Sequence, residues 1–196
     1  MTTIDPGPEP GWVRLCAGTV AGIDGLCRWS GYLTAWLTLG TVVACFATVY
    51  LRYVLGIGLI WLQELYVWQH AAVIVLGAAF TMMTGGFVRV DVLYTRWSVR
   101  RRAAMDMAMT VVLLVPFLWI FGQTTWNFFL ASWRIDEGSL NPQGLPNVWL
   151  LKGMMVVFVV LTALQGLAFV LRGAMVLAGH ERHALAHGGH GADAPV

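Results

Sequence analysis

Residues 153–171, GMMVVFVVLTALQGLAFVL, decide the fold because they form a long apolar run without a charged residue. A helix needs about 20 such residues to cross the hydrocarbon core of a bilayer. Three further runs without Asp, Glu, Lys or Arg lie upstream, at residues 29–51, 65–88 and 107–133. None of them alternates polar and apolar residues as a barrel strand would. The sequence therefore predicts an all-α integral membrane protein with four transmembrane helices.

The composition supports this fold class. Hydrophobic residues make up 58% of the 196 residues and charged residues 11%, whereas a soluble domain carries about 25% charged residues. A chain of this length cannot bury so much apolar surface in its own core. Lipid must therefore replace water around most of it. The net charge of +2 is small and the basic residues form no stripe, so nucleic-acid binding is not expected.

The basic residues predict the orientation, because short cytoplasmic loops are enriched in Lys and Arg. Nine of the 12 basic residues lie before the first run, between the second and third, or after the fourth: Arg14, Arg28, Arg89, Arg96, Arg100, Arg101, Arg102, Arg172 and Arg182. The other three are Arg52, Arg134 and Lys152. This predicts a multi-pass protein of the bacterial inner membrane with both termini in the cytoplasm. The cluster Arg96, Arg100, Arg101 and Arg102 is predicted to set the orientation and to bind lipid headgroups.

The two ends of the chain differ from the apolar runs. Residues 1–10 are acidic and rich in proline, and they are predicted to be disordered and not a cleavable signal. In residues 11–28, apolar side chains recur at helical spacing, which predicts an amphipathic helix in the cytoplasmic interface. An extension of the first transmembrane helix is the alternative. Residues 29–177 then form the transmembrane domain.

Residues 178–196 are predicted to be a disordered cytoplasmic tail, since they are rich in Gly and Ala and terminal. The tail carries His180, His183, His187 and His190, and such a tract can bind a divalent metal.

A few polar residues lie in or beside the spans, where they are costly and often functional. Arg52 and Glu64 flank a short outward hairpin and are predicted to form an interfacial ion pair; a proton or ion carrier is the alternative. Arg89 and Asp91 follow the second run and are predicted to shape the turn, by pairing locally or with a partner. His70 is predicted to be a hydrogen-bonded packing residue. A haem between helices would need a second histidine in a span, so no cofactor is expected.

The third and fourth runs contain residues that suit helix packing. Pro116 is predicted to bend the third helix. Interhelical hydrogen bonds are predicted for five polar residues: Gln123, Thr124, Thr125, Asn127 and Gln165. The sequence has no nucleophile beside a base, no Gly-rich phosphate cradle and no paired catalytic carboxylates, so it does not predict an enzyme.

Several motifs resemble those of a known family. They are Arg52-Tyr53, the sequence WLQEL at 61–65, Gly77, and the sequence GGFVRVDVL at 85–93. Together they resemble the small membrane subunit of the tripartite ATP-independent periplasmic (TRAP) transporters, the DctQ-like proteins. The sequence NPQGLP at 141–146, followed by Lys152, is similar to a branch named for mannitol or chloroaromatic compounds. Gln63 stands where many members carry a second acidic residue.

The resemblance implies a function and its partners. Such a subunit works with a large membrane subunit and a periplasmic substrate-binding protein in the sodium-coupled uptake of an organic acid or a similar small solute. It is a stationary scaffold and holds no substrate, metal or catalytic site. From the residues alone, a membrane-anchor or electron-transfer subunit of a respiratory complex remains the alternative.

Overall fold

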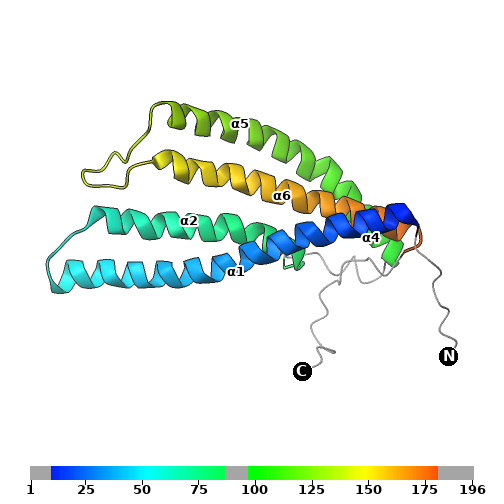
Figure 1. The fold of residues 1–196 in the computed structure, drawn as a ribbon, viewed down its shortest axis with the longest axis horizontal. Helices are drawn as coiled ribbons and strands as arrows, with labels where there is room; N and C mark the ends of the chain where they lie inside the picture. The colour runs from blue at the N-terminus through cyan, green and yellow to red at the C-terminus, as the bar shows by residue number, and fades with distance from the viewer. Residues whose placement is uncertain (1–9, 87–96, 181–196) are drawn as a thin grey trace, which may run out of the picture.

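The computed structural model describes residues 10–86 and 97–180, which form helices joined by loops and contain no strand (Figure 1). The helices are α1 (Gly11–Val54), α2 (Ile60–Met83), α4 (Val99–Met109), the π-helical turn η1 (Thr110–Leu114), α5 (Val115–Arg134) and α6 (Val148–Leu177). Within these residues four helices are long and apolar enough to cross a membrane: α1, α2, the continuous Val99–Arg134 and α6. The predicted fold class is confirmed.

The charge-free runs do not mark the ends of the helices. The second charge-free run extends to residue 88, but α2 ends at Met83. Thr84 caps the helix, and Gly85 follows with φ at +70°, in the left-handed region where glycine ends helices. The absence of charge marks a segment that lipid tolerates, but it does not mark where the backbone leaves the helix.

Helix α1 is much longer than a single span requires. At about 1.5 Å per residue its 44 residues extend for roughly 66 Å, about twice the thickness of the hydrocarbon core. No break separates residues 11–28 from the first span. This segment therefore continues the first transmembrane helix, as in the alternative interpretation. Its apolar side chains Val20, Ile23 and Cys27 are buried within the protein. Its depth in the bilayer interface stays a prediction.

The helices form a layer centred on α6. At the end where α1 meets α2, the order across the view is α1, α2, α6 and α5, and each helix contacts its neighbour (Figure 1). Toward the N-terminus α1 crosses onto α6, and α4 packs against the same helix. The core therefore joins Ile23 of α1, Ala79 of α2, and Ala168 and Met175 of α6. Helix α6 therefore contacts α1, α2, α4 and α5.

The third span is irregular beside Pro116. Proline lacks an N–H group, and its ring clashes with the carbonyl four residues earlier, here Val112. Val112 lies within η1, where the helix widens into a π-helical turn before α5 continues. The chain from α4 to α5 is curved in Figure 1. The distortion predicted at Pro116 is therefore present at this turn.

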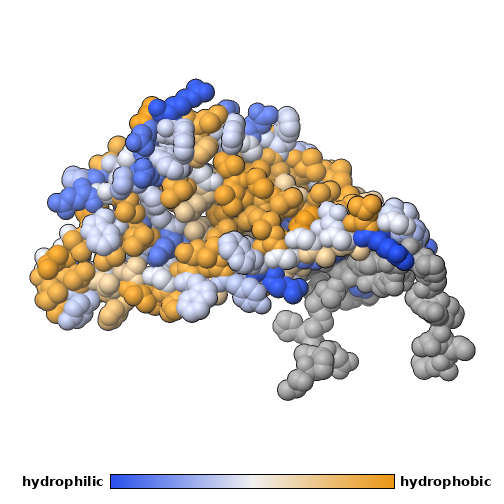
Figure 2. Space-filling view, in the orientation of Figure 1, coloured by the Kyte–Doolittle hydropathy of each residue, from blue (hydrophilic) through white to orange (hydrophobic). Residues whose placement is uncertain are grey.

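Much of the apolar surface remains uncovered. Figure 2 shows hydrophobic residues over much of the visible face. Large side chains on the two edge helices are among the most exposed, with Phe46 at 71% and Trp119 at 69%. Exposing so large an apolar surface to water is unfavourable, whereas contact with lipid or with another membrane protein is not.

Candidate functional site

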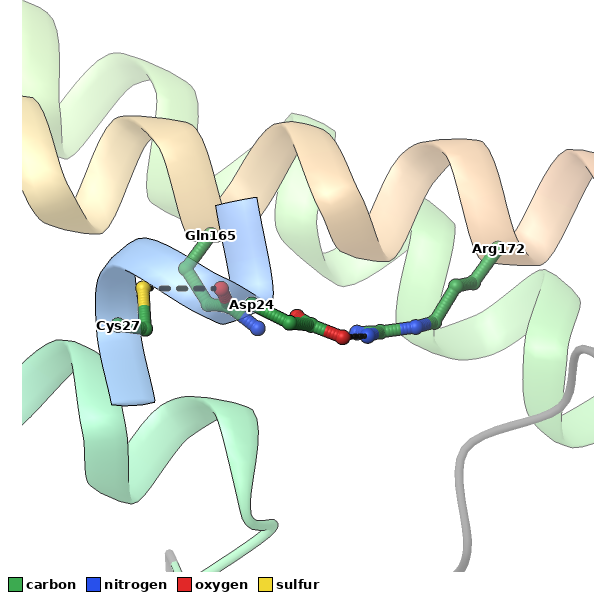
Figure 3. A network of polar contacts seen from close by, with 4 residues as sticks. All are labelled: Asp24, Cys27, Gln165 and Arg172. Carbon is green, nitrogen blue, oxygen red and sulfur yellow. Dashed lines mark hydrogen bonds and ion pairs between the residues drawn. The ribbon is translucent and has the colours of Figure 1, made fainter. Parts of the chain in front are cut away.

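Two gatherings of polar side chains connect separate elements in the part of the chain that the structure describes, and neither resembles a catalytic or metal centre. Residues 10–86 and 97–180 contain no group of three or more His, Cys, Asp or Glu side chains placed to hold a metal ion. One gathering surrounds Glu64, near the start of α2. The other lies between α1 and α6 and includes Asp24, Cys27, Gln165 and Arg172 (Figure 3).

Glu64 binds the loop that connects α5 to α6. Ser139 Oγ and Asn141 Nδ2 donate hydrogen bonds to its Oε1 at 2.5 and 2.8 Å, and the backbone N–H of Leu145 donates to its Oε2 at 2.6 Å. An ionised carboxylate only accepts hydrogen bonds and can accept several at once. One side chain in the second turn of α2 thus anchors a loop that is far away in sequence.

The loop is built closely around this carboxylate. A Cβ atom at Gly144 would overlap Ser139 Oγ and lie 2.8 Å from Glu64 Oε1, so only glycine fits there. A second contact closes the base of the loop, where Lys152 Nζ lies 2.5 Å from Glu137 Oε2 and 4.0 Å from the centre of the Phe128 ring. The hydrogen bond from Lys152 holds the pKa of the Glu137 carboxyl below its ordinary value. The loop is therefore fixed both to α2 and to α6.

The structure does not bring Arg52 and Glu64 together. Both residues are described, yet no ion pair or hydrogen bond joins them, and Arg52 is exposed at the end of α1. Sequence proximity across the hairpin suggested the pair. The loop supplies donors to both oxygens of Glu64 in place of the guanidinium.

The second gathering ties α1 to α6 (Figure 3). Asp24 and Arg172 form an ion pair, with 22% and 12% of their side chains exposed. Cys27 follows Asp24 on α1, and its thiol donates to Oε1 of Gln165, which precedes Arg172 on α6, at 3.3 Å. The Gln165 side chain is fully buried. The prediction that Gln165 joins helices is thus confirmed, with Cys27 as its partner.

The sequence analysis missed the role of Asp24. A signal was available, because Asp24 is the only acidic residue between positions 10 and 64. A lone acid on a long apolar helix needs a cation, and Arg172 follows the fourth charge-free run directly. Arg172 was used only to predict the orientation, so its role as the partner of Asp24 was not predicted.

The other predicted packing residues divide into two groups. Thr125 is buried, whereas Gln123, Thr124 and Asn127 are exposed on α5. His70 is exposed on α2 and makes no hydrogen bond to another described residue, so it does not pack inside the protein as predicted.

The predicted basic cluster is described only in part. Arg89, Asp91 and Arg96 lie outside the described residues. Arg100, Arg101 and Arg102 form the first turn of α4, where Ser98 Oγ accepts from the backbone N–H of Arg101 at 3.4 Å and Arg102 Nε donates to the Trp97 carbonyl at 3.0 Å. Their predicted contact with lipid headgroups stays a prediction.

These features define a multi-pass helical membrane protein whose described polar contacts hold helices and a loop together. Residues 41–175 match the family of tripartite ATP-independent periplasmic transporters, DctQ component. The match covers more than half of the chain, so this protein belongs to the DctQ family and is the small membrane component of a TRAP transporter. No curated protein and no solved structure matches the chain.

The family assignment decides between the alternatives that the sequence left open. A transporter component replaces the hypothesis of a respiratory anchor, and the family is not one of enzymes. The matched range also divides the second polar gathering. Gln165 and Arg172 lie within it, whereas Asp24 and Cys27 precede it.

We expect Glu64→Gln to loosen the loop between α5 and α6. The amide offers one acceptor oxygen, and its NH2 group faces a donor. A hydrogen bond to a charged group contributes about 1.5–3 kcal/mol, so the Leu145 amide should exchange with solvent about 10- to 100-fold faster. Hydrogen exchange in nanodiscs measures this rate. Arg52→Gln is the matched control and should leave the rate unchanged; equal rates in wild type and Glu64→Gln would contradict the anchoring role.

We expect the Asp24–Arg172 pair to couple energetically. Asp24→Asn or Arg172→Gln alone leaves one largely buried charge without its partner, which is destabilising. Because the pair is partly exposed, we expect a coupling energy of about 1–2 kcal/mol, within the range for contacting residues. The double variant should therefore lose less stability than the sum of the single variants. Unfolding of all four proteins in detergent measures this cycle, and strictly additive losses would show that the pair does not stabilise the fold.

Proposed function

We propose that this chain is the stationary scaffold of a TRAP transporter that takes up an organic acid or a similar small solute with sodium. A large membrane subunit moves the solute, and a periplasmic substrate-binding protein delivers it. The observation that carries the proposal is the contrast between a broad uncovered apolar surface and described polar groups that mainly tie the chain to itself.

The continuity of the helices supports a role outside the transport step. Transporter sites are often formed by interrupted helices whose free backbone groups bind substrate and ions near the middle of the membrane. Helices α1, α2 and α6 are unbroken. The third span departs from α-helical geometry only at η1, which is a continuous helical turn.

The two polar gatherings support a stationary role. The ion pair of Asp24 and Arg172 fixes α1 against α6, and Glu64 fixes α2 to the loop between α5 and α6. Polar contacts thus join α1 to α6, and they tie α2 and α6 to the loop that follows α5. A chain held in this way suits a fixed support for a subunit that moves.

The proposed location is the bacterial inner membrane, with both termini in the cytoplasm. Arg100, Arg101 and Arg102 begin α4 at one end of the protein, and the loop held by Glu64 lies at the other. In this orientation the loop faces the periplasm and the substrate-binding protein. The arginines then lie at the anionic cytoplasmic leaflet, where each contributes about 1 kcal/mol to membrane attachment.

We expect an alkaline phosphatase fused after Val196 to be inactive in the wild-type protein, because this enzyme works only in the periplasm. Replacing Arg100, Arg101 and Arg102 with Gln removes three orienting charges and should yield a fraction of active, inverted fusions. Activity is compared at equal protein level. Gln replacement of Arg52 and Arg134, on the opposite side, is the control and should leave the fusion inactive. High activity of the wild-type fusion would contradict the proposed orientation.

We expect uptake only when this chain is combined with the other two components. Three kinds of proteoliposome with a sodium gradient are prepared. They contain this chain alone, the large subunit alone, or both membrane subunits together with the binding protein. Radiolabelled succinate, pyruvate and gluconate serve as probes of the organic-acid class. Uptake by the full set, abolished when potassium replaces sodium, supports the proposal. Uptake by this chain alone would overturn the scaffold assignment.

A further inference from the structure

Helix α2 leaves one narrow stripe uncovered. Gln63, Val67, His70 and Ile74 are all exposed, and their spacing of four, three and four residues places them on one side of the helix. Val67 is 49% exposed and Ile74 60%. Apart from Trp61, every other residue of α2 is buried or half-buried. These four residues are called the α2 stripe below.

The α2 stripe places His70 near the middle of the helix. His70 is the eleventh residue of α2, so it lies about 15 Å from the start of a helix that is roughly 36 Å long. Neither His70 nor Gln63 uses its side chain to bond another described residue. An imidazole or amide without a partner in hydrocarbon is costly, and acyl chains offer no hydrogen bond. Lipid is therefore a poor occupant of this face.

The outer half of the stripe borders a crevice. A cavity of about 400 Å³ lies between α2, α6 and the anchored loop. Gln63 and Val67 line it from α2, together with Trp68, while Val148 and Leu151 line it from α6. A side chain from a neighbouring helix can enter this space while its backbone lies along the stripe. The stripe thus adjoins a space that one side chain of a neighbouring helix can fill.

The other inner helix and one edge helix differ from α2. The exposed residues in the middle of α6 are all apolar: Met155, Val157, Val160, Ala163 and Leu167. Helix α5 exposes Gln123 and Asn127, but neither lines the apolar crevice that runs between α5 and α6. In contrast to α5 and α6, α2 combines an uncovered stripe that contains polar residues with an adjoining crevice.

We propose that the α2 stripe seats a transmembrane helix of the large TRAP subunit, with a hydrogen-bonding side chain of that helix opposite His70. This rests on the proposed function. The chain is one component of a tripartite system, and the soluble binding protein cannot reach the depth of His70. The membrane partner can reach it and supplies the polar group that lipid lacks. The crevice beside Val67 receives a neighbouring side chain of the same helix.

The first test is photo-crosslinking in the intact complex. A diazirine amino acid replaces Val67 or Ile74 in the stripe, and Val160 of α6 or Phe46 of α1 at matched exposed sites. We expect adducts with the large subunit at Val67 and Ile74 that are several-fold stronger than at the control sites. Adducts only with a second copy of this chain, or only with lipid, overturn the proposal. Adducts only from the control sites also overturn it but leave the scaffold function standing, whereas failure of the wild-type proteins to co-purify contradicts the scaffold function itself.

The second test asks whether His70 contributes a hydrogen bond. His70→Leu should lower the amount of large subunit retained through detergent washes by about three- to tenfold, as expected for one interhelical hydrogen bond. His70→Gln retains hydrogen-bonding groups and should recover much of the loss. Gln123→Leu on α5 is the matched control and should retain the wild-type amount. Equal retention by His70→Leu and wild type, at equal helix content by circular dichroism, would show that His70 does not contact the partner.

Discussion

The absence of water from the bilayer core determines most of this structure. Each backbone N–H and C=O group there needs a partner within the protein, and a helix provides one for nearly every residue. Long unbroken helices are the consequence, and they leave little backbone for binding a solute. Even Pro116, which removes a hydrogen bond, is absorbed by the widened turn η1 and does not interrupt the span. The same constraint makes every unpartnered polar side chain informative.

Polar contacts within the chain occur where two elements must keep one arrangement. Asp24 meets Arg172 where α1 crosses α6, and Glu64 meets three donors where the loop between α5 and α6 returns to α2. Apolar packing alone specifies helix position weakly in lipid, because acyl chains compete equally for the same surfaces. Directional contacts of this kind define one register. They explain how four helices with so little buried surface hold a defined layer.

Most of the fold could be predicted from the sequence, because length and lack of charge are sufficient signals for a transmembrane helix. Helix ends could not, since α2 ends at Met83, two residues before the left-handed Gly85 and inside a charge-free run. The side-chain pairs could not be predicted either, for a different reason. Arg52 and Glu64 are close in sequence, but the donors to Glu64 come from residues 139, 141 and 145. Asp24 and Arg172 are 148 residues apart. Only the packing of α1 on α6 brings them together.

The contrast between Gln165 and His70 links packing to function. Both are polar residues within charge-free runs, so the sequence pattern does not distinguish them. Gln165 is fully buried, and its Oε1 accepts a hydrogen bond from Cys27, so a contact within the fold explains its position. His70 points away from the fold on the α2 stripe and makes no such bond to a described residue. Since the cost of a polar group in hydrocarbon applies to both, we infer that a neighbouring protein supplies the partner of His70. A scaffold whose partner is fixed by such residues can bind it specifically through a surface that is otherwise apolar.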